Sequence, residues 1–351
     1  YTKVAGILQH KDPQLRHDYA PLVPHLENLY AVYHALAKAR AKRGAIDFET
    51  VETKVVFNEQ GGIAAIRPTV RNDAHKLIEE CMIAANVQAA KFLTKHKLPT
   101  LYRVHAGPDT EGLEKLRAFL GTLGLKLGGG TKPEPAHYAK LLEQVRERPD
   151  WDLIQTVLLR SLSQAVYTPE NVGHFGLALS HYAHFTSPIR RYPDLLVHRA
   201  IRHVLRGGSE RNFSYSGSHM EQMGSHCSMT ERRADEATRD AMDRLKAEYM
   251  RDKQGEEFDG LVTGVTNFGL FVQIKDLYVE GLIHVTSLPN DYYTHDPVGH
   301  RLVGERSGRV FRLTDPVRVR VAAVNLDECK IDFELLAAPT ANKSRKPRRR
   351  R

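Results

Sequence analysis

The sequence predicts an α+β protein in two parts, followed by a tail. Residues 1–254 form a mostly helical region with some strand, and residues 255–337 form a small closed β-barrel. Apolar residues recur at helical spacing through the first part, whereas short alternating strands with glycine-containing turns begin after Gly255. Residues 339–351 hold seven Lys or Arg and no acidic residue, so the segment 338–351 is expected to be a disordered basic tail.

The first part combines helices with one pair of strands. Strands are expected over 53–57 and 63–70, because they flank Gly61 and Gly62 in a hairpin pattern. Asn72 can cap the helix that follows. Helices are expected over 25–43, 72–97, 111–122, 135–147, 150–166, 193–205 and 219–252. The inward face of the 72–97 helix is expected to carry Leu77, Cys81, Ala84, Ala85, Ala89, Phe92 and Leu93.

Composition excludes several classes of protein. Hydrophobic residues make up 41% of the chain and charged residues 26%, which excludes global disorder. The three cysteines form no CxxC motif, which excludes a disulfide scaffold and a zinc-thiolate site and favours the reducing cytoplasm. No apolar run approaches the roughly 18 residues of a membrane span, and no signal-like segment is present. The chain starts with Tyr1 in mid-pattern, so we expect a piece of a longer protein.

The positive charge is concentrated in the tail. The chain carries a net charge of +9, and residues 1–338 carry only +2 because the tail holds seven cations. A polycationic tail can act as an arm that contacts the phosphates of nucleic acid. The alternative interpretation is a solubilising end without a binding role.

The segment TSPIRRYPD, residues 186–194, is unusual for a purely structural stretch. Pro193 suits the first position of a helix, so Arg190 and Arg191 are expected in a stiff loop just before a helix N-terminus. Two cations there oppose the helix dipole, and a bound anion would remove that conflict. Helix N–H groups and a guanidinium fork together form a phosphate site. The alternative is that one of these arginines pairs with Asp194 or another carboxylate and simply packs.

The barrel segment has a pattern of glycines, aromatics and one histidine. The sequence GLVTGVTNFGLFV is followed by EGLIH, and it resembles the RNA-binding barrel first described in ribosomal protein S-one. The resemblance implies an OB-fold whose RNA face includes Phe268, Phe271 and His284. Phe268 and Phe271 are three residues apart, so we expect them to face opposite sides, with one ring exposed. Basic residues in the later strands are further candidates for RNA contacts: Arg318, Arg320 and Lys330.

A longer resemblance covers essentially the whole chain. The segments HFGLALSHYAHFTSPIRRYPDLLVHRAI, RNDAHKLIEECMIAAN and HCSMTERRADEATRD resemble the RNB family of 3′→5′ exoribonucleases, and the basic tail favours its ribonuclease R branch. The resemblance implies processive hydrolysis of single-stranded and structured RNA to nucleoside 5′-monophosphates, with Mg²⁺ held by clustered aspartates. It places Arg190 on the scissile phosphate and Glu79 on the terminal sugar. Phe48 would belong to an aromatic clamp, and Ser187 and Arg191 would also contact RNA.

One part of the family pattern does not match. Asp150/Asp152, Asp235/Glu236, Asp240/Asp243 and Glu256/Glu257/Asp259 are the tight acidic groups of the chain. They do not have the spacing of the family's metal site, so we assign no metal ligand and expect the Mg²⁺ ligands upstream of this chain. The chain alone is therefore expected to bind RNA without hydrolysing it.

Two classes of function are kept. The first is the C-terminal portion of an exoribonuclease, and the alternative is a non-catalytic RNA-binding or adaptor protein. The resemblance also implies a cytoplasmic monomer without membrane contact, with RNA-decay or ribosome quality-control factors as possible partners.

Overall fold

The computed structural model describes residues 1–48, 51–289 and 291–337, and the predicted tail at 338–351 lies outside these residues. The chain divides into two compact units, residues 1–49 with 70–235 and residues 50–69 with 236–351. The helical region followed by an OB-type barrel confirms the predicted fold class. The domain boundary at residue 254 stays a prediction.

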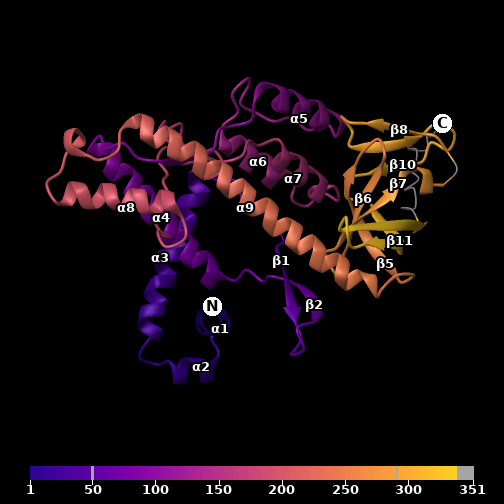
Figure 1. Ribbon diagram of the computed structural model, residues 1–351, viewed down its shortest axis with the longest axis horizontal. Coiled ribbons are helices and arrows are strands. Elements are labelled where there is room, and N and C mark those ends of the chain that lie inside the picture. Colours follow the sequence, from indigo (N-terminus) through magenta and orange to yellow (C-terminus); the bar gives the residue numbers. More distant parts are fainter. Residues whose placement is uncertain (49–50, 290, 338–351) are drawn as a thin grey trace, which may run out of the picture. The chain divides into compact units, whose positions relative to one another are not determined.

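The first unit is built mainly of helices (Figure 1). The bounds are α1 (Thr2–Leu8), α2 (Pro13–Asp18), α3 (Val23–Lys42), α4 (Asp73–Lys95), α5 (Thr110–Thr122), α6 (Pro135–Val145), α7 (Trp151–Arg160) and α8 (Tyr192–Leu205). Strands β3 (Tyr102–Val104) and β4 (Val166–Thr168) pair antiparallel. The long helix α9 (Gly217–Arg251) begins in this unit and continues into the second. A short 3₁₀ turn, η1 (Glu210–Asn212), precedes α9.

Helix α4 starts where its sequence predicts. The Asn72 side chain accepts a hydrogen bond from the His75 backbone N–H (3.3 Å), and the His75 ring accepts one from the Asn72 N–H. This reciprocal capping satisfies two N–H groups that the first turn of a helix would otherwise leave free. The cap fixes the start of α4 and therefore which of its side chains share a face.

Helix α4 packs against α8 and β3 in one core. Ala90 and Leu93 of α4 contact a cluster that includes Val104 of β3 with Val197 and Ala200 of α8, and all five side chains are buried. Burying a Val or Leu side chain stabilises the fold by about 1.5–3 kcal/mol. This packing positions the N-terminus of α8 relative to α4.

One helix prediction is wrong at its C-terminal end. Helix α7 ends at Arg160, and residues 166–168 form β4 instead of continuing the helix to 166. The Ser161 hydroxyl donates to the Leu158 carbonyl (2.7 Å), a local bond that competes with helix continuation. Pairing of Val166–Thr168 with β3 supplies the backbone partners that a longer helix would have given. The short helices α1 and α2 were not predicted.

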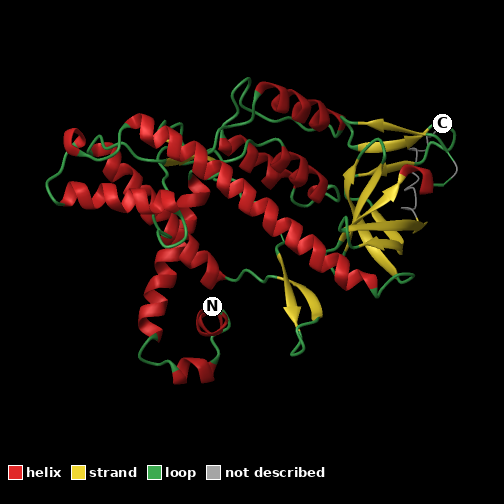
Figure 2. Ribbon diagram, viewed as in Figure 1, coloured by secondary structure: helices red, strands yellow, loops and turns green. Residues whose placement is uncertain are grey.

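The second unit contains a closed five-stranded barrel with the strand order β11-β12-β7-β6-β5. Figure 2 shows strands in yellow. The barrel strands are β5 (Glu257–Val265), β6 (Gly269–Ile274), β7 (Glu280–His284), β11 (Pro316–Asn325) and β12 (Lys330–Ala337). A three-stranded sheet consists of β8 (Tyr293–Asp296), β9 (Arg301–Gly304) and β10 (Val310–Arg312), and η2 (Val285–Ser287) follows β7. The hairpin of β1 (Thr53–Phe57) and β2 (Ile63–Pro68) belongs to the same unit.

Alternating apolar residues build one core for this unit. Val272, Ile283 and Phe333 point into the barrel, and Phe311 of the three-stranded sheet and Ile66 of the hairpin join the same buried cluster. The barrel, sheet and hairpin are therefore one packing unit. None of the helices in the described part of the chain is both long and apolar enough to pass through a bilayer.

Candidate functional site

The loop before α8 is fixed by one buried carboxylate. The Ser187 carbonyl accepts hydrogen bonds from the backbone N–H groups of Arg190 (3.3 Å) and Arg191 (3.0 Å), which closes a turn. Asp194, in the first turn of α8, is 0% exposed. Its Oδ1 accepts from the Ser187 N–H (2.7 Å) and from Arg191 Nη2 (2.8 Å). Asp194 therefore ties both ends of the turn to the helix.

The two arginines of this loop have different environments. Arg191 pairs with Asp194 and its side chain is only 20% exposed, which confirms the pairing alternative for one of the two residues. Arg190 is exposed, and its guanidinium has no hydrogen-bond or ion-pair partner among the described residues. A free guanidinium just before a helix N-terminus is suited to bind an anion, because the helix dipole favours negative charge there.

Three polar atoms of this segment are buried without a partner in the described structure. They are Thr186 Oγ1, Arg191 Nε and Asp194 Oδ2. Buried polar atoms are nearly always hydrogen-bonded, and leaving one unsatisfied costs about 1–3 kcal/mol. All three atoms lie within nine residues of chain around Arg190, where a bound group could supply the missing partners.

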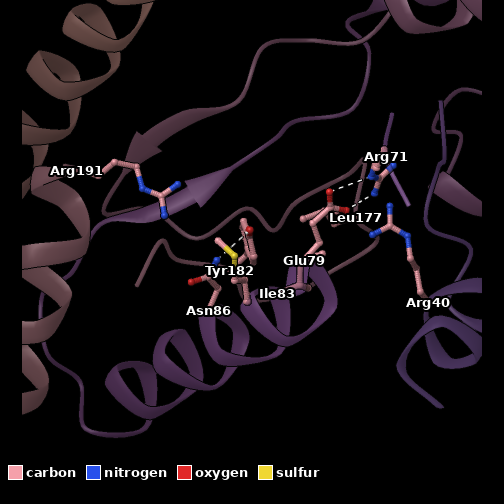
Figure 3. Close-up of a pocket in the computed structure, with 9 residues that line it drawn as sticks. Arg40, Arg71, Glu79, Ile83, Asn86, Leu177, Tyr182 and Arg191 are labelled. Atoms are coloured by element: carbon pink, nitrogen blue, oxygen red, sulfur yellow. Dashed lines mark hydrogen bonds and ion pairs between the residues drawn. The ribbon is translucent and has the colours of Figure 1, made fainter. Parts of the chain in front are cut away.

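A cavity of about 280 Å³ lies along one face of α4 (Figure 3). Glu79 and Asn86 are seven residues apart, so they share this helix face. Arg191 lies at one end of the cavity, and Arg40 and Arg71 lie near Glu79 at the other. Met82, Ile83, Leu177 and Tyr182 complete the lining. The cavity therefore combines three guanidinium groups with one carboxylate and an apolar floor.

Glu79 is already engaged by an arginine. Arg71 Nε donates to Glu79 Oε1 (2.9 Å), and Arg71 Nη2 donates to the other carboxylate oxygen. This bidentate contact raises the pKa of Arg71, chiefly through the hydrogen bonds to Glu79. Arg40 pairs with Asp47 (2.7 Å) and Glu80 (3.1 Å). For the Glu79 carboxylate to accept a hydrogen bond from a ligand hydroxyl, Arg71 has to share or release that carboxylate.

Two residues that line the cavity, Asn86 and Tyr182, are joined by a hydrogen bond. Asn86, which is buried, donates to the Tyr182 hydroxyl (3.1 Å) and accepts from the Phe185 backbone N–H (2.9 Å). Asn86 therefore links α4 directly to the segment that leads into the Arg190 loop. The residue before Phe185, His184, contacts the Tyr167 hydroxyl (2.8 Å), and burial lowers the pKa of His184 to about 3. A neutral His184 leaves the positive charge of this region to the arginines.

The structure brings some of the predicted residues together and leaves others apart. Glu79 and Arg191 line the same cavity, and Arg190 and Ser187 belong to the adjoining loop. Phe48 is half-buried in the segment after α3 and is not one of the cavity-lining residues. The roles assigned to these residues stay predictions.

Sequence reasoning did not single out four residues that build the site: Arg40, Arg71, Asn86 and Tyr182. Arg71 and Asn86 had a usable signal, because they begin and end the quoted segment 71–86 that contains Glu79. Helical spacing from Glu79 would have selected Asn86. Tyr182 lies within the quoted segment 174–201, which had the same kind of signal. Arg40 comes from a distant part of the sequence, and no quoted segment contains it.

On the barrel, the predicted aromatic residues and the histidine lie together. The rings of Phe268 and Phe271 meet edge to face with centroids 5.9 Å apart, and Phe268 is 45% exposed. The expectation of one exposed ring is confirmed, but the two rings do not face opposite sides. Phe268 precedes β6, so the strand alternation does not extend to it. His284 is paired with Gly269 across β6 and β7 and is exposed.

Gly269 allows this close approach. An added Cβ at position 269 would lie 2.3 Å from the Ile283 carbonyl oxygen. Any side chain there would push β6 away from β7 and separate Phe268 from His284. The glycine of the quoted pattern is therefore a packing requirement of the aromatic face.

The three basic residues predicted for the later strands are already paired. Arg318 pairs with Glu257 (3.4 Å) and Asp259 (3.1 Å), and Arg320 pairs with Glu257 (3.0 Å) and Glu334 (3.0 Å). Lys330 pairs with Glu328 (2.7 Å).

Arg318 also lies away from the ring of Phe271. Arg318 is opposite Asp259 on β5, whereas Phe271 is opposite Gly264. Five residues of strand separate these positions, which is roughly 17 Å. The structure therefore does not bring Arg318 to Phe271. An RNA contact by these cations would have to displace a carboxylate.

The resemblance implies a divalent cation, which would need a cluster of acidic side chains. Within residues 1–48, 51–289 and 291–337, no group of three or more His, Cys, Asp or Glu side chains is arranged to hold a metal ion. Glu79 and Glu80 are engaged by arginines, and Asp194 is tied to the loop. The described residues do not fit a Mg²⁺ site.

Comparison with known proteins agrees with both parts of the chain. The model of the RNB domain matches residues 1–207, and that of the S1 RNA binding domain matches residues 251–336. Ribonuclease R of Vibrio cholerae is 56% identical over 345 residues, covering 96% of this chain and 42% of that protein. Ribonuclease R of Escherichia coli is 56% identical over 349 residues, covering 97% of this chain and 43% of that protein.

A solved structure shows the same fold. Mycoplasma genitalium RNase R in complex with ribose methylated single-stranded RNA superposes with a TM-score of 0.84 at 26% identity, over 90% of this chain and 50% of that one. The chain spans somewhat over two fifths of the length of the curated relatives given above. With an RNB domain model matched over more than half of its residues and an OB-fold barrel after it, the chain belongs to the RNB family.

Proposed function

We propose that this chain is the RNA-holding portion of a ribonuclease R-type 3′→5′ exoribonuclease, which degrades single-stranded and structured RNA processively to nucleoside 5′-monophosphates. The observation that carries the proposal is the unpaired guanidinium of Arg190 on a loop that Asp194 locks to the N-terminus of α8. Such a fork can grip a phosphate in two places without spending energy on ordering its loop. The ribonuclease R relatives supply the reaction class.

Several residues of this chain would then bind the 3′ end of an RNA strand. Arg190 binds the phosphate, while Arg191 stays with Asp194 as support. The Glu79 carboxylate accepts a hydrogen bond from the terminal ribose when Arg71 shares it. The cavity between them has an apolar floor and a net positive lining, as a nucleotide requires.

Hydrolysis is proposed to need groups from beyond this chain. The complete enzyme is proposed to use Mg²⁺, and its carboxylate ligands are expected upstream, because the described residues here do not fit a metal site. The three cysteines are free, which suits a reducing cytoplasm. RNA-decay or ribosome quality-control factors remain proposed partners, and a monomer is the proposed state.

The test uses the chain as it exists, with single-stranded RNA labelled at its 5′ end. The 351-residue protein should bind the RNA in a salt-dependent manner and should release no nucleotides with Mg²⁺ or Mn²⁺. A metal-dependent ladder of shortened RNA that disappears in Arg190→Ala would contradict this proposal. It would show that acidic residues of this chain, such as Asp240 with Asp243, form a metal site.

The alternative is a non-catalytic RNA-binding or adaptor protein. A second experiment joins the chain to the residues that precede it in its parent protein. Restored 3′ shortening that requires Arg190 supports the exoribonuclease. RNA binding without any shortening in the complete protein supports the adaptor.

A further inference from the structure

The three-stranded sheet of the second unit carries an exposed aromatic ring beside free arginines. Tyr292 precedes β8 and is 70% exposed. The guanidinium of Arg306 lies over the Tyr292 ring at 5.7 Å from its centroid. Neither Arg306 nor the exposed Arg309 makes a hydrogen bond or ion pair through its guanidinium within the described residues. They contrast with Arg318 and Arg320, whose charges are neutralised by carboxylates.

The turn that presents these side chains is rigidly built. The Asp291 carboxylate accepts hydrogen bonds from the backbone N–H groups of Arg306 (3.0 Å), Ser307 (2.8 Å) and Tyr292 (2.8 Å), and from the Ser307 hydroxyl (2.5 Å). These bonds, with that of the Ser307 hydroxyl as the largest cause, lower the pKa of Asp291 to about 2. Asp291 thus joins the start of β8 to the turn between β9 and β10.

The glycines of the turn are required by this arrangement. An added Cβ at Gly304 would lie 2.4 Å from Asp291 Oδ2 and 2.7 Å from Ser307 Oγ. Gly308 has φ +63°, a conformation that favours glycine. Glycine at positions 304 and 308 therefore allows the turn that holds Tyr292 and Arg306 in place.

We propose that Tyr292 and Arg306, with Arg309 beside them, form a binding site for single-stranded RNA separate from the aromatic face at Phe268. An exposed ring offers a stacking surface for a base, and every base has such a face. The Arg306 guanidinium, which lies over the ring, can bind the adjoining phosphate while a base stacks on the ring. The inference rests on the proposed RNA-binding function and adds a contact point to it.

The unpaired guanidinium groups and the small apolar area favour a nucleic acid strand over a protein partner. The Asp291 carboxylate is saturated by the turn, and Asp296 pairs with Arg301 (2.8 Å). Glu305 is the remaining acid of the turn, and its carboxylate accepts from the Thr294 hydroxyl (2.9 Å). Within the described residues neither Asp291 nor Glu305 forms an ion pair with Arg306 or Arg309, so both guanidinium groups are available to phosphates. A single exposed ring is too small an apolar area for a protein interface.

The test measures binding of the 351-residue chain to labelled single-stranded RNA by fluorescence anisotropy. Tyr292→Ala should weaken binding about tenfold, equivalent to about 1.4 kcal/mol, whereas Tyr292→Phe keeps the ring and should bind like the parent. Arg306→Ala should also flatten the dependence of log affinity on log salt by about 0.7. The matched control is Arg301→Ala, which removes an equal charge from the same sheet but a paired one.

An abasic ribose-phosphate probe separates the two contributions. Tyr292→Ala should leave binding of this probe unchanged, because no base remains to stack, and Arg306→Ala should still weaken it. Thermal melting identifies variants that fail to fold, and Tyr292→Phe keeps the test valid if Tyr292→Ala is one of them. In that case Tyr292→Phe must bind RNA like the parent. The effect of Arg306→Ala on RNA binding then decides whether the site exists.

Two negative results are distinguishable. If Tyr292→Ala and Arg306→Ala bind RNA within twofold of the parent while Phe268→Ala is weaker, this site is refuted and the RNA-binding proposal stands; a protein-docking role for the ring would give this result. If the parent chain does not bind RNA at all, both proposals fail.

Discussion

Replacing Asp194 tests whether one buried carboxylate holds the Arg190 loop in place. Asp194 is fully buried and receives the Ser187 N–H at 2.7 Å and Arg191 Nη2 at 2.8 Å. Removing one partner of a buried ion pair costs about 3–5 kcal/mol. Arg191 is 20% exposed and can regain some water, so the lower limit of about 3 kcal/mol is expected for Asp194→Ala.

The asparagine variant separates charge from hydrogen bonding. Asp194→Asn keeps an oxygen for the Ser187 N–H, a bond worth about 1 kcal/mol, so its loss of unfolding free energy should be about 2 kcal/mol. A double replacement of Asp194 and Arg191 by alanine should cost less than the sum of the single replacements, because no unpaired charge is left buried.

The assay follows urea unfolding through Trp151, the single tryptophan, which lies in the same compact unit. This local probe avoids mixing the transitions of two units. Glu111→Gln, which breaks an exposed pair with Lys115, serves as the control and should leave the midpoint unchanged. An unfolding free energy of Asp194→Ala within about 1 kcal/mol of the parent, at equal slope, would refute the claim that this carboxylate locks the loop.

Four further predictions follow from single features. In the complete enzyme, Arg190→Lys should lose most turnover with little change in RNA binding; a single-turnover rate within about threefold of the parent, or roughly 0.7 kcal/mol, would remove Arg190 from the site. Deleting residues 339–351 should flatten the salt dependence of RNA affinity by up to about 0.7 per lost contact without changing base preference, and an unchanged slope would exclude the tail from phosphate binding. Burial lowers the pKa of His174 and His184 to about 3, so unfolding takes up protons between about pH 3 and 6.5. Unfolding free energy should therefore fall as pH drops through this window, by up to about 1.4 kcal/mol per unit for each histidine, and stay level above it; replacing His174 by Gln should reduce that slope. Gly269→Ala should separate β6 from β7, lowering the melting temperature and weakening RNA binding together, whereas an unchanged melting temperature would show that the strands adjust.

Local patterns predicted the parts of the fold that depend on neighbours in sequence. Asn72 caps α4 as expected, and Leu77, Ala89 and Leu93 are buried on its inward face. The same stripe did not show that Asn86 is buried, because a buried amide needs partners that only the folded chain supplies. Those partners, Tyr182 and the Phe185 backbone, lie about a hundred residues further along the chain.

The sequence predicted the position of Arg190 and Arg191 but not their partners. Pro193 predicted a helix start with Arg190 and Arg191 just before it, and this is observed. The sequence left open which arginine pairs with Asp194. Helix geometry decides it, because Arg191 is the N-cap residue and lies three positions before Asp194, a spacing that brings side chains together. Arg190, one residue earlier, lies in the turn and remains available.

Strand register decides which arginines of the second unit can contact phosphate. Arg318 and Arg320 have the composition of RNA ligands, but the pairing of β11 with β5 places Asp259 and Glu257 directly opposite them. Register depends on the whole barrel, so no local pattern could predict this neutralisation. A phosphate approaching these arginines meets carboxylates already in place, whereas Arg306 faces a ring. The salt dependence of RNA binding by this unit should therefore come more from Arg306 than from the arginines of β11.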